Sequence, residues 1–271
     1  MALAAVGQFC ATSFVEANTK ICCGLIKKAA ERGAKMLFLP EASDFIAESK
    51  EQALSLASNH VFIQGVQQAA KDANIWVSVG FHEQCHEDTQ RLFNTQIVMN
   101  DNGSVVAHYR KIHLFDVDIK NGPRLMESES TIAGDSLVPP VKTPLGQVGL
   151  QICYDVRFSE LSIAQRRLGA DVLTFPSAFT VKTGMAHWET LLRARAIETQ
   201  CYVMAAAQIG QHNPKRASYG HAMIVDPWGT VLGQCADTQE GLAFGVVDLD
   251  YLGRIRQEMP VMTHRRPDQY Q

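Results

Sequence analysis

The chain has 271 residues, of which 46% are hydrophobic and 20% charged, and its formal net charge is -3 at pH 7. This length is enough to bury a large core, and we expect a single domain over residues 1–271. The basic residues are spread among acidic ones, which argues against nucleic acid or an anionic membrane as a partner.

Features that report on cellular compartment point to a reducing environment. No apolar run approaches the length of a bilayer span, and the start MALAAVGQFCATSF lacks the basic flank of a secretory signal. The seven cysteines have no regular spacing, and the pair Cys22 and Cys23 has no second CxxC or histidine cluster near it, so we expect neither disulfides nor zinc. We expect a cytoplasmic protein, with a mitochondrial pool left open.

Two segments share the pattern of a helix followed by a short buried strand. Residues 33–40 read GAKMLFLP and residues 169–176 read GADVLTFP. Each begins with a glycine, which can stop a helix in the left-handed conformation, and each ends in a proline. The apolar residues of the two preceding helices recur at helical spacing: Ile21, Leu25, Ile26 and Ala29 before the first, and Leu161, Ile163, Ala164 and Leu168 before the second.

A second pair of similar segments predicts hairpins. Residues 96–107 read QIVMNDNGSVVA and residues 222–233 read AMIVDPWGTVLG. Both are β-branched runs around a turn that ends in glycine. Short apolar strings also recur by chance in α/β proteins, but both pairs occur here in the same order. The duplication predicts an α/β fold in which two mixed sheets pack face to face, with helices on both outer faces.

The thiol best placed for chemistry is Cys153, at the end of the apolar run 147–152 and just before an expected helix. At such a corner backbone N–H groups are free and the helix dipole favours a thiolate. The N–H of Tyr154 would then be an oxyanion donor. A single cysteine at the end of a buried run is more often an inert core residue, so Cys153 needs partners to be a nucleophile.

Two charged residues could be those partners. Glu41 directly follows a buried strand, at the sheet edge where open α/β sheets bind ligands, and desolvation there would raise its pKa towards the range of a general base. Lys111 ends the returning strand of the first hairpin and could stabilise both a thiolate and an oxyanion. Read alone, each is more often a solvated charge at the end or edge of a strand.

The surrounding strings carry a family resemblance. FLPE at 38–41, YRKIH at 109–113 and CYDVRF at 153–158 resemble the Glu, Lys and Cys boxes of the nitrilase (carbon-nitrogen hydrolase) superfamily, in its order and at about its spacing. The resemblance covers nearly the whole chain. It implies a four-layer αββα sandwich, a homodimer, and a second glutamate that orients the lysine, at Glu127 or at the neighbouring Glu129, with Glu127 as our choice.

Longer strings resemble one branch of that superfamily. Residues 176–179, 184–198 and 215–229 are similar to the Nit branch, and within it more to the deaminated glutathione amidases than to the omega-amidases. The implied substrate is glutathione whose glutamyl amino group is replaced by a ketone, cleaved to 2-oxoglutarate and cysteinylglycine as metabolite repair. We expect Arg157 to bind a substrate carboxylate, or else to pair with Asp155 or Glu160, and Phe179 and Thr183 to line the pocket from a loop.

The resemblance implies a mechanism that needs neither a metal nor an organic cofactor. Glu41 takes the thiol proton, Cys153 attacks the amide, Lys111 and the Tyr154 N–H hold the oxyanion, and water releases the acid from a thioester. Three alternatives stay open: an omega-amidase acting on 2-oxoglutaramate or another small amide, a Cys-His enzyme that uses one of the histidines at 113, 187 and 221, and a binding scaffold for a nucleotide-hydrolase partner.

Overall fold

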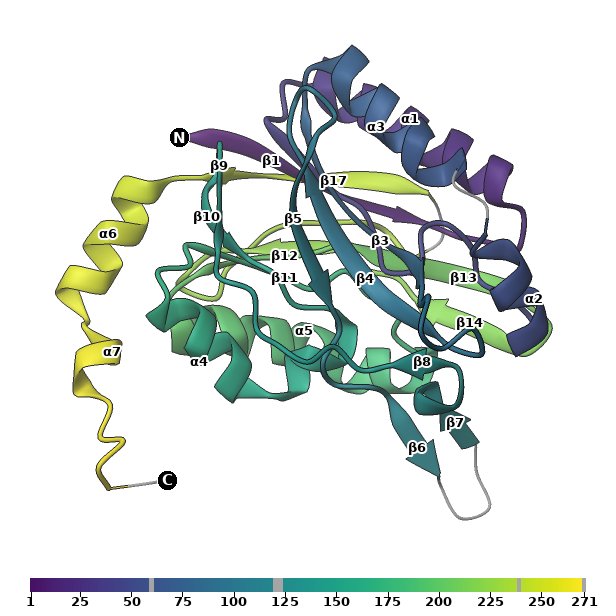
Figure 1. The fold of residues 1–271 in the computed structure, drawn as a ribbon. Helices are drawn as coiled ribbons and strands as arrows, with labels where there is room; N and C mark the ends of the chain where they lie inside the picture. Colours follow the sequence, from purple (N-terminus) through teal and green to yellow (C-terminus); the bar gives the residue numbers. More distant parts are fainter. Residues whose placement is uncertain (59–60, 119–123, 238–239, 270–271) are drawn as a thin grey trace.

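The structure is a computed structural model that describes residues 1–58, 61–118, 124–237 and 240–269. Within these ranges two mixed sheets face each other, and helices cover their outer sides (Figure 1). This arrangement confirms the predicted α/β sandwich with two mixed sheets and two outer helical layers. No helix in the described ranges combines the length and the apolar character that crossing a bilayer requires.

The first sheet has the order β14-β13-β1-β2-β3-β4-β5, with β17 also paired to β1 and β8 to β4. Neighbours among β13, β1, β2 and β3 run parallel, and β4, β5, β14 and β17 pair antiparallel. Its strands are β1 (Ala2–Phe9), β2 (Met36–Phe38), β3 (Trp76–Gln84), β4 (Leu92–Met99), β5 (Val105–Arg110), β8 (Thr131–Ile132), β13 (Ala207–Asn213), β14 (Arg216–Tyr219) and β17 (Gly241–Val247).

The second sheet has the order β16-β15-β12-β11-β10-β9, with β10, β11 and β12 parallel. Its strands are β9 (Val141–Thr143), β10 (Gly146–Gly149), β11 (Val172–Thr174), β12 (Tyr202–Ala205), β15 (Met223–Val225) and β16 (Val231–Gln234). A separate antiparallel pair is formed by β6 (Asp116–Asp118) and β7 (Arg124–Met126).

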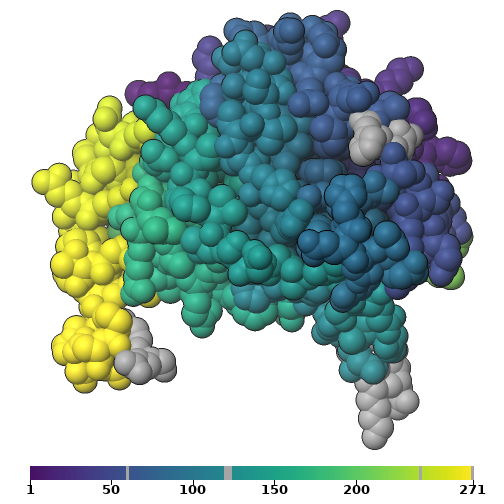
Figure 2. All heavy atoms as spheres, viewed as in Figure 1, coloured from purple at the N-terminus to yellow at the C-terminus, as the bar shows by residue number. Residues whose placement is uncertain are grey.

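The helices divide between the two outer faces. The first sheet carries α1 (Val15–Glu31) and α3 (Val61–Ala73), with α2 (Lys50–Leu56) at its edge, and the second carries α4 (Ser159–Arg167) and α5 (Val181–Thr199). The chain ends with α6 (Leu249–Glu258) and α7 (Val261–His264). Figure 2 shows these last helices in yellow at one side and the β6–β7 segment at the other, both projecting beyond the main body.

Alternation along the strands divides the core between layers. In β2, Met36 and Phe38 belong to the buried cluster that includes Val148 of the second sheet, whereas Leu37 belongs to the cluster with α1 and α3. Successive side chains of a strand point to opposite faces, so one apolar run serves both layers. All three β2 residues are buried, as the sequence predicts for a strand covered on both faces.

The similar sequence segments occupy corresponding places in the two sheets. β2 lies between parallel β1 and β3, and β11 lies between parallel β10 and β12, while the hairpins β4–β5 and β15–β16 follow.

The predicted apolar face of the helix before β11 was wrong in one detail. The buried face of α4 consists of Leu161, Ser162 and Gln165, and the expected Leu168 is 51% exposed. Ser162 and Gln165 are buried because they bond Gln151 Oε1 and the carbonyl of Val138.

Candidate active site

Cys153 lies at the corner between the second sheet and the helices on its outer face. β10 ends at Gly149, and Cys153 begins a short 3-10 helix (Cys153–Arg157) that leads into α4. The predicted corner is therefore present, although its first helix is a 3-10 turn. Cys153 has φ 45°, a left-handed conformation that costs a residue with a side chain about 1 to 3 kcal/mol and is often found at functional sites. Its N–H donates to the Pro176 carbonyl at 3.0 Å, which helps to hold this conformation.

The buried carboxylate of Asp155 ties this corner to the end of β5. Its Oδ2 accepts from the Ile152 N–H at 2.8 Å and from the Tyr109 hydroxyl at 2.7 Å. Its Oδ1 lies 2.8 Å from Nδ1 of His113, whose ring stacks on Phe158. Because Tyr109 and His113 flank Lys111, Asp155 fixes the corner at Cys153 relative to the segment that carries the lysine.

Glu41 lies in the turn after β2, and its side chain points into the molecule. The residue is 4% exposed. The turn is held against β3 by the Gly80 N–H, which donates to the Pro40 carbonyl at 3.1 Å, and Gln208 Nε2 donates to the Glu41 carbonyl at 3.0 Å. The Ala178 N–H donates to Glu41 Oε2 at 2.7 Å, which connects the turn to the loop after β11.

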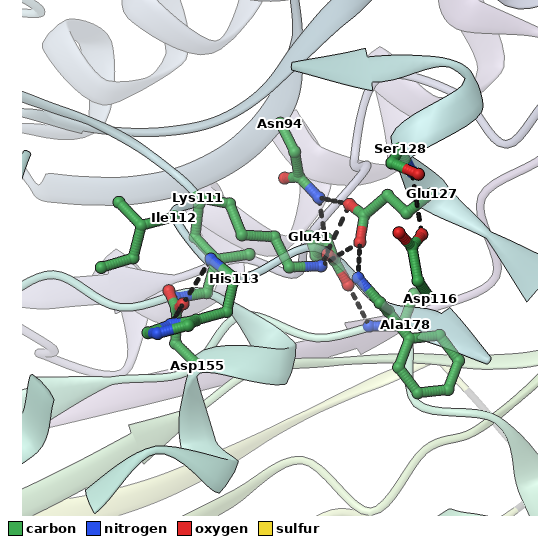
Figure 3. A network of polar contacts seen from close by, with 12 residues as sticks. Glu41, Asn94, Lys111, Ile112, His113, Asp116, Glu127, Ser128, Asp155 and Ala178 are labelled. Carbon is green, nitrogen blue, oxygen red and sulfur yellow. Dashed lines mark hydrogen bonds and ion pairs between the residues drawn. The ribbon is translucent and has the colours of Figure 1, made fainter. Parts of the chain in front are cut away.

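Lys111 joins two carboxylates at the centre of the site (Figure 3). Its Nζ lies 3.1 Å from Glu41 Oε1, and 3.1 and 2.8 Å from Oε1 and Oε2 of Glu127. The side chain of Lys111 is 2% exposed. Asn94 Nδ2 donates to Glu41 Oε1 at 2.7 Å and to Glu127 Oε1 at 3.0 Å. The structure thus brings together the glutamate, the lysine and the second glutamate that the sequence suggested.

The geometry distinguishes Glu127 from Glu129. Glu127 contacts Lys111 with both oxygens and also accepts from the Phe115 N–H at 2.7 Å. Glu129 instead forms an ion pair with Arg124, and both side chains are more than half exposed. Of the two candidates, Glu127 is therefore the glutamate that contacts Lys111.

The charges of this cluster stabilise one another. Burial acts to raise the pKa of Glu41, but the Lys111 charge and hydrogen bonds from Asn94, Cys153 and Lys111 outweigh it, and the net pKa is lowered. Burial acts to lower the pKa of Lys111, but the charges of Glu127 and Glu41 raise it well above its usual value. The expected net rise of the Glu41 pKa was wrong, because desolvation, although the largest single influence, is outweighed by the combined effect of the Lys111 charge and the hydrogen bonds. Glu41 is a carboxylate at neutral pH and can accept a proton.

The resting state of Cys153 also differs from the expectation. Burial and the nearby Glu41 charge raise the pKa of the thiol, and Lys111 opposes them only in part. The helix dipole therefore does not produce a thiolate here. The Cys153 thiol and the Glu41 carboxylate lie close enough to shift each other's pKa, so a protonated thiol lies beside an ionised carboxylate. This pairing suits a thiol that loses its proton during the attack rather than before it.

Beside the cysteine, Arg157 presents a guanidinium over aromatic rings. Its Cζ lies 5.5 Å from the centre of the Phe179 ring and 5.8 Å from that of Tyr154. Both terminal nitrogens lie 3.3 Å from Nδ1 of His187. Within the described ranges no ion pair joins Arg157 to Asp155 or Glu160, so the alternative of an intramolecular pair was wrong. The guanidinium remains available for an anion.

The other predicted pocket residues differ in their placement. Phe179 is 7% exposed and packs against Trp188 at 4.9 Å between ring centres. Thr183 is not in a loop but in the first turn of α5, where its hydroxyl lies 2.7 Å from that of Thr180. The N–H of Tyr154 makes no hydrogen bond to any described residue, as an oxyanion donor requires.

The three histidines considered as a possible base contact groups other than Cys153 among the described residues. His113 bonds Asp155, His187 faces Arg157, and His221 Nδ1 bonds the Tyr219 carbonyl at 3.0 Å. The described residues contain no group of three or more metal-ligating side chains. A cavity of about 340 Å³ lies between α3 and β3 and is lined by Phe45, Phe62 and neighbouring residues, but Cys153 does not line it.

Sequence reasoning missed several residues that shape the site. Asn94 and Ala178 hydrogen-bond the Glu41 carboxylate, Gly80 lets its turn approach β3, and Asp155 holds the corner. Asp155 could have been found, because it lies inside the cysteine box and was considered only as a partner of Arg157. No local pattern marks Asn94, since its role depends on the pairing of β4 with the strands beside it.

Comparison with known proteins establishes the family. The Carbon-nitrogen hydrolase model matches residues 3–257. Deaminated glutathione amidase of Bos taurus is 52% identical over 273 aligned residues, which cover 99% of this chain and 83% of that protein, and the Homo sapiens protein of the same name is 50% identical. The chain therefore belongs to the carbon-nitrogen hydrolase family, whose members hydrolyse carbon–nitrogen bonds.

Solved structures agree with this assignment. The NitFhit protein of Caenorhabditis elegans superposes with a TM-score of 0.96 at 47% identity, covering 100% of this chain and 66% of that chain. Nit3 of Saccharomyces cerevisiae, described as a member of branch 10 of the nitrilase superfamily, superposes with a TM-score of 0.85 at 28% identity, over 98% of this chain and 96% of that one. The nitrilase-superfamily resemblance, its Nit branch, the fold and the expected enzyme class are confirmed.

Proposed function

We propose that this hydrolase is an amidase that cleaves deaminated glutathione to 2-oxoglutarate and cysteinylglycine through a thioester on Cys153. The observation that carries the proposal is the placement of the Cys153 thiol beside a buried, ionised Glu41, which shares Lys111 with Glu127. The substrate is suggested by the names of relatives about half identical over almost the whole chain.

Acylation begins with transfer of the thiol proton to Glu41 as sulfur attacks the amide carbonyl. The developing oxyanion is stabilised by the Lys111 ammonium and by the Tyr154 N–H. Glu41 and Lys111 are almost fully shielded from solvent, which strengthens these interactions. The tetrahedral intermediate collapses, the carbon–nitrogen bond breaks, and Glu41 returns the proton to the departing amine of cysteinylglycine. A 2-oxoglutaryl thioester remains on Cys153.

Deacylation uses the same groups in reverse order. Glu41 accepts a proton from water, the resulting nucleophile attacks the thioester, and Lys111 with the Tyr154 N–H again stabilises the oxyanion. The carbon–sulfur bond breaks, and the proton returns from Glu41 to the sulfur. 2-Oxoglutarate leaves, and the free thiol is restored. Each group ends in its starting state, so the cycle consumes only the amide and water.

Arg157 supports the choice of an acidic substrate. Its guanidinium stands over Phe179 and Tyr154 with no carboxylate partner among the described residues. A carboxylate beside the substrate ketone could accept two parallel hydrogen bonds from it. Arg157 ends the short 3-10 helix that begins at Cys153, and in this proposal the acyl group on the thiol extends towards its guanidinium.

We also propose that the chain forms a single domain and that two copies form a homodimer through the layer of α4 and α5. Apolar side chains are exposed along α5, where Met185 is 72% and Ile197 46% exposed, and Trp228 beside this helix is 58% exposed. Apolar exposure of this kind often marks an interface. Sedimentation velocity should show a dimer for the wild type and a monomer for Met185→Lys combined with Ile197→Lys. A wild-type monomer at micromolar concentration would contradict the proposed homodimer.

A cytoplasmic location is also part of the proposed function, and the seven free cysteines support it.

The proposed reaction is tested by comparing two substrates. The purified chain is assayed with deaminated glutathione and with 2-oxoglutaramate, each with wild type and Cys153→Ala. We expect a higher kcat/KM for deaminated glutathione and no turnover of either compound by the variant. A preference for 2-oxoglutaramate would make the chain an omega-amidase, and turnover of both by Cys153→Ala would refute the nucleophile.

A further inference from the structure

Asn94 occupies a position between the two acidic residues that the sequence gives no reason to expect. It lies on β4, and its side chain is buried. Its Nδ2 donates to Glu41 Oε1 at 2.7 Å and to Glu127 Oε1 at 3.0 Å, so both hydrogens of the amide nitrogen are used (Figure 3). Its backbone carbonyl accepts from the Lys111 N–H at 2.8 Å. One residue thus contacts all three charged members of the site.

The remaining hydrogen bonds show what this amide adds. Oε2 of Glu41 accepts from the Ala178 N–H, and Oε2 of Glu127 accepts from Lys111 and from the Phe115 N–H. Oε1 of each glutamate accepts from Lys111 and from Asn94. Without the amide, the ammonium would be the single side-chain donor that links the two carboxylates among the described residues.

We propose that Asn94 is a positioning residue for the hydrolysis, whose side-chain amide holds Glu41 and Glu127 on either side of Lys111 and thereby directs the Glu41 carboxylate towards Cys153. This inference rests on the proposed function of the site. Asn94 touches neither the sulfur nor the substrate in this account. It acts through Glu41 and Lys111.

The chemistry of the position explains why an amide serves better than a carboxylate. The site already contains two carboxylates and one ammonium, all close together. A third carboxylate would repel both glutamates, whereas the neutral amide brings two donors without adding charge. A hydrogen bond to the ionised form of Glu41 also disfavours its protonation, so loss of the amide makes Glu41 hold a proton at higher pH.

The test uses Asn94→Asp, which preserves size and removes the donors, and Asn94→Ala, which leaves room for water. The matched control is Gln96→Ala. Gln96 lies two residues along β4, and its buried side-chain amide bonds Ser78 and Thr174 but neither glutamate. Thermal unfolding is measured first. If Asn94→Ala does not fold, Asn94→Ser, which retains one donor, replaces it with a smaller expected shift.

Two readouts are recorded against pH: kcat/KM for amide hydrolysis, and the alkylation rate of Cys153 by iodoacetamide, followed by mass spectrometry of its peptide. For Asn94→Ala we expect the acid limb of both profiles to move up by about one pH unit, since two or three hydrogen bonds lower a carboxylate pKa by about two units or more. Asn94→Asp should shift it further. The main kinetic loss should be in kcat rather than in KM.

The control should keep the wild-type acid limb even if its stability falls. Unshifted limbs in both Asn94 variants, or an equal shift in Gln96→Ala, would overturn the proposal and leave Asn94 a packing residue. The alkylation profile does not depend on the substrate. If the wild type hydrolysed neither amide, the proposed function would fail, while the shift in alkylation would still decide the role of Asn94.

Discussion

Gly80 on β3 offers a sharp test of how closely Glu41 must be placed, because it is remote from the nucleophile in sequence and carries no functional group. A Cβ built on Gly80 would lie 2.7 Å from Glu41 Cα and 2.9 Å from the Pro40 carbonyl oxygen. Ordinary contacts begin at 3.4 Å, so Glu41 Cα would be 0.7 Å too close to the new Cβ. Both atoms are backbone, and neither can move aside by changing a rotamer.

We therefore expect Gly80→Ala to fold but to displace the Glu41 turn. Overpacking in a buried site costs about 1 to 3 kcal/mol of stability, which a domain of ordinary stability survives. A displacement approaching 1 Å at a catalytic group can lower the rate about 100-fold, so kcat should fall by about 10- to 100-fold. KM should change little, because Arg157 lies on another segment.

The control for this variant is Gly24→Ala in α1, where a Cβ would meet nothing within 4 Å. Alanine there should raise stability by about 0.5 to 1 kcal/mol and leave kcat unchanged. The assay is amide hydrolysis at saturating substrate, with thermal unfolding in parallel. A wild-type kcat in Gly80→Ala would show that the placement of the Glu41 turn does not limit the reaction.

Three further variants test the lysine, the arginine and a structural carboxylate. Lys111→Arg keeps the charge but replaces a point-like ammonium with a planar fork, so the single-turnover acylation rate should fall about 100-fold or more; an unchanged rate would make Lys111 structural. Arg157→Lys should lower kcat/KM for deaminated glutathione by about 10- to 100-fold, equivalent to about 1.5 to 3 kcal/mol, and spare a neutral amide; an equal loss on both would argue against carboxylate binding. For Glu83, hydrogen bonds from His108, Arg110 and Thr95 outweigh the effect of burial and lower its pKa from 4.5 to about 2. A lowered carboxylate pKa stabilises the fold above pH 4.5, and this contribution disappears as the pH falls towards 2. Between those pH values the free energy of unfolding of Glu83→Gln, measured by denaturant titration, should therefore fall by about 2 to 3 kcal/mol less than that of the wild type. Parallel curves of unfolding free energy against pH would refute this.

Much of the site was predictable because its charged residues lie at the ends of strands that the sequence marks clearly. Glu41 and Lys111 each follow a strand, and Cys153 follows the run that contains β10, so the topology of two facing sheets brings these ends together. The paired helix-strand and hairpin segments predicted that topology. The family boxes then selected these residues from other strand-end charges.

What could not be predicted depends on close contacts between distant segments. The left-handed backbone of Cys153 is held in part by its bond to Pro176, and the lowered pKa of Glu41 follows from Lys111 and from hydrogen bonds that include Asn94. A sequence shows burial tendencies but not which donor reaches which oxygen. For this reason the sign of the Glu41 shift was wrong, although its burial was expected.

The position of Thr183 shows the same limit at the level of secondary structure. The expected loop after Pro176 ends earlier than the sequence indicated, because α5 begins at Val181. Thr183 and Thr180 then satisfy each other's hydroxyls in the first turn of the helix. Threonine is a poor marker of such a boundary, since it is common both in loops and near helix starts.

The most direct test of the account is to detect the acyl group on Cys153 during turnover. Wild-type protein is mixed with excess deaminated glutathione, quenched in acid within the first turnovers and digested for mass spectrometry. A parallel reaction contains hydroxylamine, which intercepts a thioester as the hydroxamate. We predict a 2-oxoglutaryl group on the Cys153 peptide, 2-oxoglutaryl hydroxamate in the parallel reaction, and neither with Cys153→Ala. Continued hydrolysis with no hydroxamate and no acylated peptide, or an acyl group on a different residue, would contradict the assignment of Cys153 as the nucleophile.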